Sequence, residues 1–179
     1  MGLWVLTETI RGWERAGKPA DLSTLLAAAA AAPADGPVFN VNDPSFLPPG
    51  DMPARIDAWF AARGIRGPST SAEYVRCIVE SLAQAFADAA LPAGRIGGVP
   101  VRTIHIVGGG ALNELLCQRT ADRSGLPVLA GPVEATALGN ILVQARAVGL
   151  IEGTLEDLRY RVVRTHSPRR YDPQASRIR

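Results

Sequence analysis

The sequence predicts an α/β fold in one domain over residues 1–179, with a short parallel sheet and many helices. Of the 179 residues, 47% are hydrophobic and 20% are charged, which is enough for a sizeable core. Aromatic residues make up only 6%, whereas alanine, a strong helix former, is abundant. One run of β-branched residues leads directly into three consecutive glycines and then into a helical pattern. This order is typical of the strand–loop–helix units of α/β proteins.

The first 90 residues are predicted to be mainly helical. Apolar residues recur at helical spacing over residues 3–16 and indicate an amphipathic helix. A second helix, capped by either Asp21 or Ser23, contains an alanine run and ends at Pro33. The alanine run favours a helix packed closely on a neighbour over a low-complexity linker.

Residues 34–53 predict a packed loop, because they combine many prolines with apolar side chains. A third helix is predicted over residues 54–63. A fourth, over residues 71–90, has apolar residues at positions i, i+3, i+4, i+7 and i+11. The glycines and prolines of residues 92–100 then predict a turn-rich connection.

Residues 91–164 are predicted to form a strand, a glycine loop, a helix, a strand and a helix, followed by a shorter helix. The predicted elements are a strand over 101–107, a helix over 112–124, a strand over 127–130, and helices over 134–148 and 155–164. The order implies a parallel βαβ unit. Residues 165–179 are interpreted as a basic tail with a solvated end.

The segment VGGGALN, residues 107–113, is the strongest candidate for chemistry. Three glycines allow the backbone to approach a ligand closely and to turn its amides toward an anion at the start of a helix. The dinucleotide fingerprint would need a glycine where Asn113 stands, and the Lys-Ser/Thr pair of a Walker loop is absent. A phosphate loop and a simple tight turn remain equally open on these residues alone.

A second candidate is GPVEATALGN, residues 131–140, which follows the next predicted strand. Its first residues should lie at the same sheet edge as the glycine loop, where ligands bind in open α/β sheets. Glu134 is more simply a first-turn acidic residue that complements the helix dipole than a ligand contact. Gly139, inside the predicted helix, is expected to pack on the glycine loop.

Charge and composition narrow the classes of partner. The formal net charge is only +2 and basic residues do not cluster before the tail, so a nucleic-acid partner is not expected. No apolar run reaches the roughly 18 residues that a membrane span needs. Cys77 and Cys117 fit buried thiols in a reducing cytoplasm and provide no metal pattern. His105, within a predicted strand, is interpreted as a packed neutral histidine.

The segment from 107 to 145, together with MGLWVLTE, NDPSFLPPGDMP and VRCIVESLAQAF, resembles the C-terminal half of the FGGY carbohydrate kinases, and among them the rhamnulokinases. The resemblance covers nearly the whole chain in order. It implies a partial actin-like, ribonuclease-H-like ATPase domain, the later part of the second domain of a sugar kinase. The implied reaction uses ATP and magnesium to phosphorylate a ketose such as L-rhamnulose.

The same resemblance implies the site residues. Gly109 matches a nucleotide-binding position best, with Gly108, Gly110 and Asn113 beside it. Thr7 occupies a position where rhamnulokinases usually have a glutamine that contacts the nucleotide. The catalytic base and the sugar pocket are expected upstream of Met1, so the chain alone is expected to be inactive. The alternative is a non-catalytic remnant that binds nucleotide weakly or mediates an interaction.

A homo-oligomer is also expected. By resemblance, the strands that would flank residues 101–107 precede Met1. An unpaired apolar strand recruits another strand where it can, and the contact is expected near this strand or near the first helix.

Overall fold

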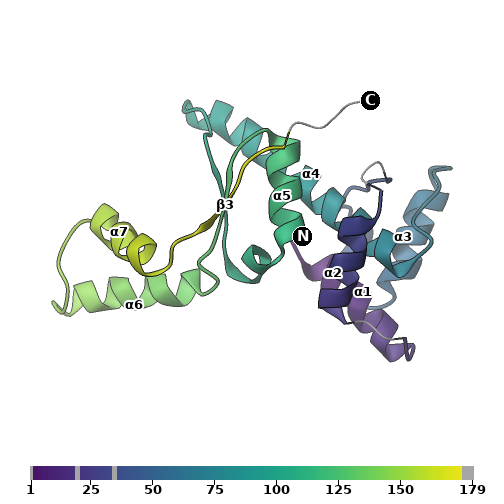
Figure 1. The fold of residues 1–179 in the computed structure, drawn as a ribbon, viewed down its shortest axis with the longest axis horizontal. Coiled ribbons are helices and arrows are strands. Elements are labelled where there is room, and N and C mark those ends of the chain that lie inside the picture. Colours follow the sequence, from purple (N-terminus) through teal and green to yellow (C-terminus); the bar gives the residue numbers. More distant parts are fainter. Residues whose placement is uncertain (1, 19–20, 34–35, 175–179) are drawn as a thin grey trace. The chain divides into compact units, whose positions relative to one another are not determined.

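The computed structural model describes residues 2–18, 21–33 and 36–174. The chain divides into two compact units, Met1–Val99 and Pro100–Arg179. The first is helical and the second contains a small mixed sheet, so the fold is α/β as predicted (Figure 1).

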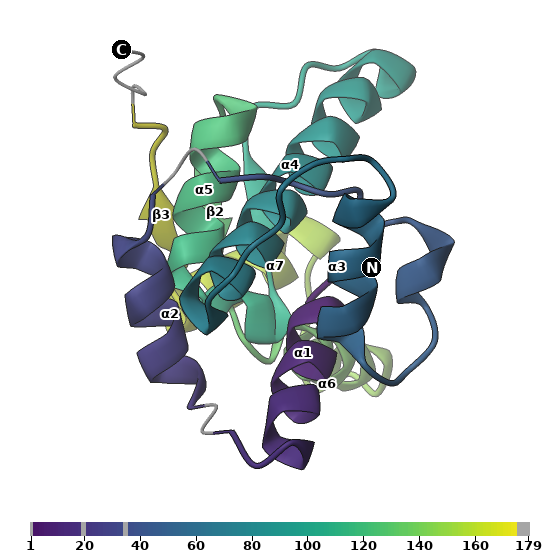
Figure 2. The ribbon, with the colours of Figure 1, turned by 90° about the vertical axis from the view of Figure 1, so that its right-hand side faces the viewer.

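The first unit is a helical cluster centred on one long helix. It consists of α1 (Trp4–Arg15), α2 (Leu22–Ala31), the 3₁₀ turn η1 (Pro44–Phe46), α3 (Met52–Ala61) and α4 (Ser71–Gly97). α2 packs along α4, while α1 contacts both α3 and α4 (Figure 2). Of the two caps considered for α2, Asp21 is the one used, because its carboxylate accepts a hydrogen bond from the Thr24 amide.

α4 is longer than the sequence predicts. It begins with a capping box, in which the Thr70 hydroxyl and the Glu73 carboxylate each accept from the other residue's backbone amide. It then continues through Pro92, where a turn-rich connection was expected, because the flanking alanines are strong helix formers. It ends at Gly97, and the next residue, Gly98, has a φ of +67° and gives the left-handed cap that glycine favours. None of the helices in the described ranges is long and apolar enough to span a membrane.

The loop between α2 and α3 is packed, as predicted. Phe39 and Phe46 are buried with their ring centroids 4.9 Å apart, and Phe60 of α3 meets Phe39 at 6.1 Å. The Trp4 indole donates to the carbonyl of Phe46 at 3.3 Å. These contacts fasten an irregular segment to α1 and α3 through an aromatic core.

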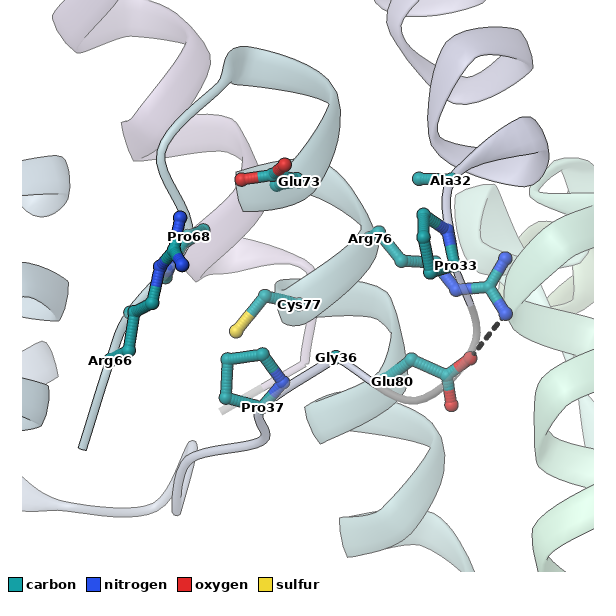
Figure 3. A pocket seen from close by; sticks show the side chains of 11 residues that line it. Ala32, Pro33, Gly36, Pro37, Arg66, Pro68, Glu73, Arg76, Cys77 and Glu80 are labelled. Atoms are coloured by element: carbon teal, nitrogen blue, oxygen red, sulfur yellow. Dashed lines mark ion pairs between the residues drawn. The ribbon is translucent and has the colours of Figure 1, made fainter.

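A buried ion pair lies on α4 of the first unit. The Arg76 guanidinium donates to the Glu80 carboxylate at 2.8 Å, one helical turn along α4, and the side chains are only 7% and 1% exposed (Figure 3). Arg76 also donates to the carbonyls of Ala29 and Ala30 in α2. The pair and these carbonyl contacts therefore join α2 to α4 by polar interactions.

The second unit is built around three short strands, β1 (Ile104–Ile106), β2 (Val128–Ala130) and β3 (Arg169–Tyr171), in the order β1-β2-β3. β1 and β2 are parallel, with Ile104 opposite Val128. β3 is antiparallel to β2, with Tyr171 opposite Val128. The helical elements are η2 (Gly108–Leu112), α5 (Glu114–Ser124), α6 (Ala135–Ala147) and α7 (Leu155–Thr165).

The predicted βαβ order is confirmed, and three details differ. The first strand is three residues long instead of seven, and His105 within it is exposed, not packed. The basic tail contains a strand, β3, because Tyr171 buries its ring where it pairs with Val128. α6 has the predicted boundaries to within a residue, but none of its residues is buried.

We expect the free energy of unfolding to depend strongly on the buried ion pair between Arg76 and Glu80. Arg76→Met removes the guanidinium that pairs with the buried Glu80 carboxylate and that binds two carbonyls of α2, and should lower the free energy of unfolding by about 3–5 kcal/mol. Adding Glu80→Leu removes the buried carboxylate as well and should restore part of the loss. Urea denaturation of both variants measures the difference. A double variant no more stable than Arg76→Met would contradict this account.

Candidate functional site

The candidate site lies at the carboxyl ends of β1 and β2, where two loops are hydrogen-bonded to each other. The Gly108 amide donates to the carbonyl of Pro132 at 3.2 Å, and the Gly131 amide donates to that of Ile106 at 2.8 Å. The peptide bond between Gly131 and Pro132 is cis. The expectation that the glycine loop and residues 131–140 begin at one sheet edge is therefore confirmed.

The glycine loop is a separate turn, not the start of α5. Gly108 has a φ of +72°, which other residues adopt only with strain, and η2 then carries the chain to Asn113. The helix was predicted to begin at about residue 112, directly after the glycines, but α5 begins at Glu114. Gly109 has an ordinary φ, and a Cβ built on it would meet no atom within 4 Å. Its open side could admit a ligand close to the backbone.

Asn113 joins this turn to α5. Its side-chain oxygen accepts from the Leu116 amide at 3.0 Å and caps the helix, and the residue is only 5% exposed. The oxygen of Asn113 thus serves the structure of the loop. A contact from Asn113 to a ligand would use its side-chain amide nitrogen.

A cavity of about 450 Å³ opens beside the two loops. Its walls come from the end of η2, from residues 130–134 and from the segment that leads into β3: Ala111, Leu112, Glu114, Ala130, Gly131, Pro132, Val133, Glu134, His166, Ser167, Arg169 and Tyr171. The three glycines are not among these wall residues. The volume falls within the range of small-molecule pockets.

Four wall residues come from the segment that was predicted to be a solvated tail: His166, Ser167, Arg169 and Tyr171. Arg169 pairs with Glu114 of α5 and lies 5.3 Å from the ring of Tyr171. Burial raises the pKa of the Tyr171 hydroxyl above its usual value. The apolar Tyr171 within a polar stretch was the one signal in the sequence for a strand there.

Glu134 and Gly139 differ in how well the structure agrees with their predicted roles. Glu134 is exposed at the N-cap of α6, and its side chain makes no capping hydrogen bond. This position fits only a favourable interaction of its negative charge with the helix dipole. Gly139 was expected to pack on the glycine loop, and this is wrong: a Cβ there would meet nothing within 4 Å.

Thr7 lies on α1 in the first unit. It is exposed, and its hydroxyl donates to the carbonyl of Leu3 at 3.1 Å. A threonine in this backbone-bonded rotamer reaches less far than a glutamine. The structure thus brings Gly108, Gly109, Gly110 and Asn113 together in one turn, and Thr7 belongs to the other unit.

A second cavity, of about 380 Å³, lies in the first unit beside Pro33, Pro37, Pro68 and Cys77, with Arg76 in its wall (Figure 3). The Arg76 Nε has no hydrogen-bond partner in the described part of the chain, but it is itself shielded. A ligand in this cavity would not reach that nitrogen as the side chains stand. No group of three metal-ligating side chains occurs within residues 2–18, 21–33 and 36–174.

The chain is similar to known sugar kinases. It is 41% identical over 175 residues to a rhamnulokinase of Pectobacterium carotovorum subsp. carotovorum (strain PC1) and 41% identical over 144 residues to one of Enterobacter sp. (strain 638). The alignments cover 98% and 80% of this chain but 34% and 29% of those proteins. The crystal structure of xylulose kinase from Rhodospirillum rubrum superposes with a TM-score of 0.63 at 22% identity, over 98% of this chain and 34% of that one.

The chain therefore spans about a third of the length of the first of these relatives, and the likeness in structure establishes the fold. Residues 1–148 match the C-terminal domain of the FGGY family of carbohydrate kinases. Together with the glycine turn and the joined loops, this match shows that the chain belongs to the FGGY family of carbohydrate kinases.

Proposed function

We propose that this chain is the nucleotide-binding C-terminal portion of an ATP-dependent sugar kinase that phosphorylates a ketose such as L-rhamnulose. The observation that carries the proposal is the 41% identity to a rhamnulokinase over 98% of the chain. The glycine turn supports it, because a backbone open at Gly109 suits close approach of a nucleotide. Two buried, unpaired cysteines fit a cytoplasmic location.

In this proposal, the residues around the turn hold and orient ATP. The nucleotide lies against Gly109. Gly108 and Gly110 have no side chains that would block its approach, and the side-chain amide nitrogen of Asn113 is within reach of it. Magnesium enters with the nucleotide, since Mg²⁺ is usually bound through substrate phosphates and one or two carboxylates.

Phosphoryl transfer needs both substrates to be positioned, with a base near the sugar hydroxyl. In our proposal, the base and most of the sugar pocket belong to the part that the relatives have beyond the 34% matched here. One observation favours a second candidate, a non-catalytic module with weak nucleotide affinity: Thr7 replaces the expected glutamine. Kinase activity in a longer protein that contains this chain would decide between the two.

The 179-residue chain alone should not phosphorylate L-rhamnulose with ATP and magnesium, because half of a nucleotide site cannot align both substrates. A coupled assay for ADP release provides the measurement, with the sugar omitted as the blank. Turnover above the blank that disappears in Gly109→Ala would overturn this prediction.

Nucleotide binding should depend on the open side of Gly109. The chain should bind ADP with a millimolar Kd, and Gly109→Ala should weaken binding at least about tenfold, or 1.4 kcal/mol, because the added methyl occupies the space of the ligand. NMR titration measures both values. The matched control is Gly139→Ala, also open but within α6, which should leave binding unchanged and stabilise the fold by up to about 1 kcal/mol. Equal Kd values for wild type and Gly109→Ala would argue against nucleotide at this turn.

We also expect the isolated chain to self-associate through the outer edge of β1. The Ile104 amide donates to the carbonyl of Pro127, and the Ile106 carbonyl accepts from Gly131, so the backbone groups of His105 point away from β2. His105→Pro removes the outward N–H donor and should shift the assembly toward monomer, whereas His105→Ala keeps the donor and should not. Light scattering at tens of micromolar measures the masses. A monomeric wild type would refute the proposal.

A further inference from the structure

α6 is an apolar helix without a covering partner in the described structure. It has the sequence ATALGNILVQARA, Arg146 is its only charged residue, and no residue in it is buried. Ile141 is 62% exposed and Val143 is 49% exposed. A 13-residue helix is marginal in water on its own, and helices of this length in proteins owe their stability mainly to tertiary packing. Something must therefore cover α6 in the functional protein.

One apolar face of α6 forms a groove together with α7. Leu138, Ile141 and Leu142 lie at helical spacing on α6, and Val162 faces them from α7, around a space of about 430 Å³. Figure 1 shows α6 and α7 side by side at one end of the second unit. Exposed apolar side chains continue along α7, where Leu155 and Val163 are each 51% exposed. An apolar surface of this extent is typical of an interaction site.

The rim of the groove is positively charged. Arg161 and Arg164 line it, and no acidic residue does. An apolar partner surface that also carries a carboxylate would therefore match it in both shape and charge. A second copy of the chain is a poor match. A two-fold contact through this groove would bring Arg161 and Arg164 of both copies together.

We propose that the α6–α7 groove is the docking surface for the part of an FGGY kinase that the relatives have and this 179-residue chain does not. The length argues for this occupant, because the chain accounts for 34% of the relative to which it is 41% identical. The partner segment presents apolar side chains to Leu138, Ile141 and Leu142 and an acidic side chain to Arg161 or Arg164. This inference is independent of where the nucleotide binds.

Thiol labelling can test the groove directly. Ile141→Cys is made in the 179-residue chain and in a fusion in which the upstream part of the Pectobacterium carotovorum rhamnulokinase precedes it. The native thiols add little background, because burial raises the pKa of Cys77 to about 12 and of Cys117 to about 11. Reaction with iodoacetamide should be at least tenfold slower at position 141 in the fusion than in the chain alone.

The matched control is Asn140→Cys, which lies on the opposite face of the same helix and should label at similar rates in both proteins. Arg161→Glu together with Arg164→Glu should restore fast labelling of Ile141→Cys in the fusion, with circular dichroism reporting that the helices are retained. Equal rates at position 141 in chain and fusion, or equal slowing at positions 140 and 141, would refute the proposal. Labelling that slows with rising concentration of the chain alone would overturn it in favour of a homodimer.

Discussion

The parallel pairing of β1 with β2 is the contact on which the candidate site depends. Because the two strands run in the same direction, the chain leaves both at one edge, and the glycine turn and residues 131–134 meet there. Two backbone hydrogen bonds, Gly108 to Pro132 and Gly131 to Ile106, then fix the loops to each other. The positive φ values of Gly108 and Gly131 make these turns possible, which explains why glycine stands at both positions.

The first unit is stabilised differently. Its irregular segment between α2 and α3 is fastened by the rings of Phe39, Phe46 and Phe60, and α2 is fastened to α4 by Arg76 and Glu80. A buried ion pair contributes little net stability compared with apolar residues of the same size, but breaking it is costly. Its effect is to fix how α2 lies along α4, since the Arg76 guanidinium reaches carbonyls near the end of α2. Apolar contacts alone would tolerate sliding of one helix on the other.

Two surfaces of the second unit lack, within the described residues, the packing partners that such surfaces usually have. One is the outer edge of β1, which presents the backbone groups of His105, and the other is the apolar face of α6. Both exposed surfaces are consistent with a chain that aligns with about a third of the length of a relative. Strand edges and apolar helix faces are energetically costly to leave in water, so their exposure carries information about what a protein binds.

The sequence alone determined the helices apart from the last turns of α4, the order of the two parallel strands and the family, because periodic apolar patterns and glycine-rich loops are local signals. It predicted that two loops share one sheet edge, and hydrogen bonds at Gly108 and Gly131 confirm this. Tertiary structure alone decided the rest. β3 forms because Tyr171 finds Val128 across the sheet, a partner 43 positions away that no local pattern reveals. Likewise, the exposure of His105 and the open space around Gly139 depend on which residues lie beside them in the fold. A periodic sequence pattern does not identify those residues.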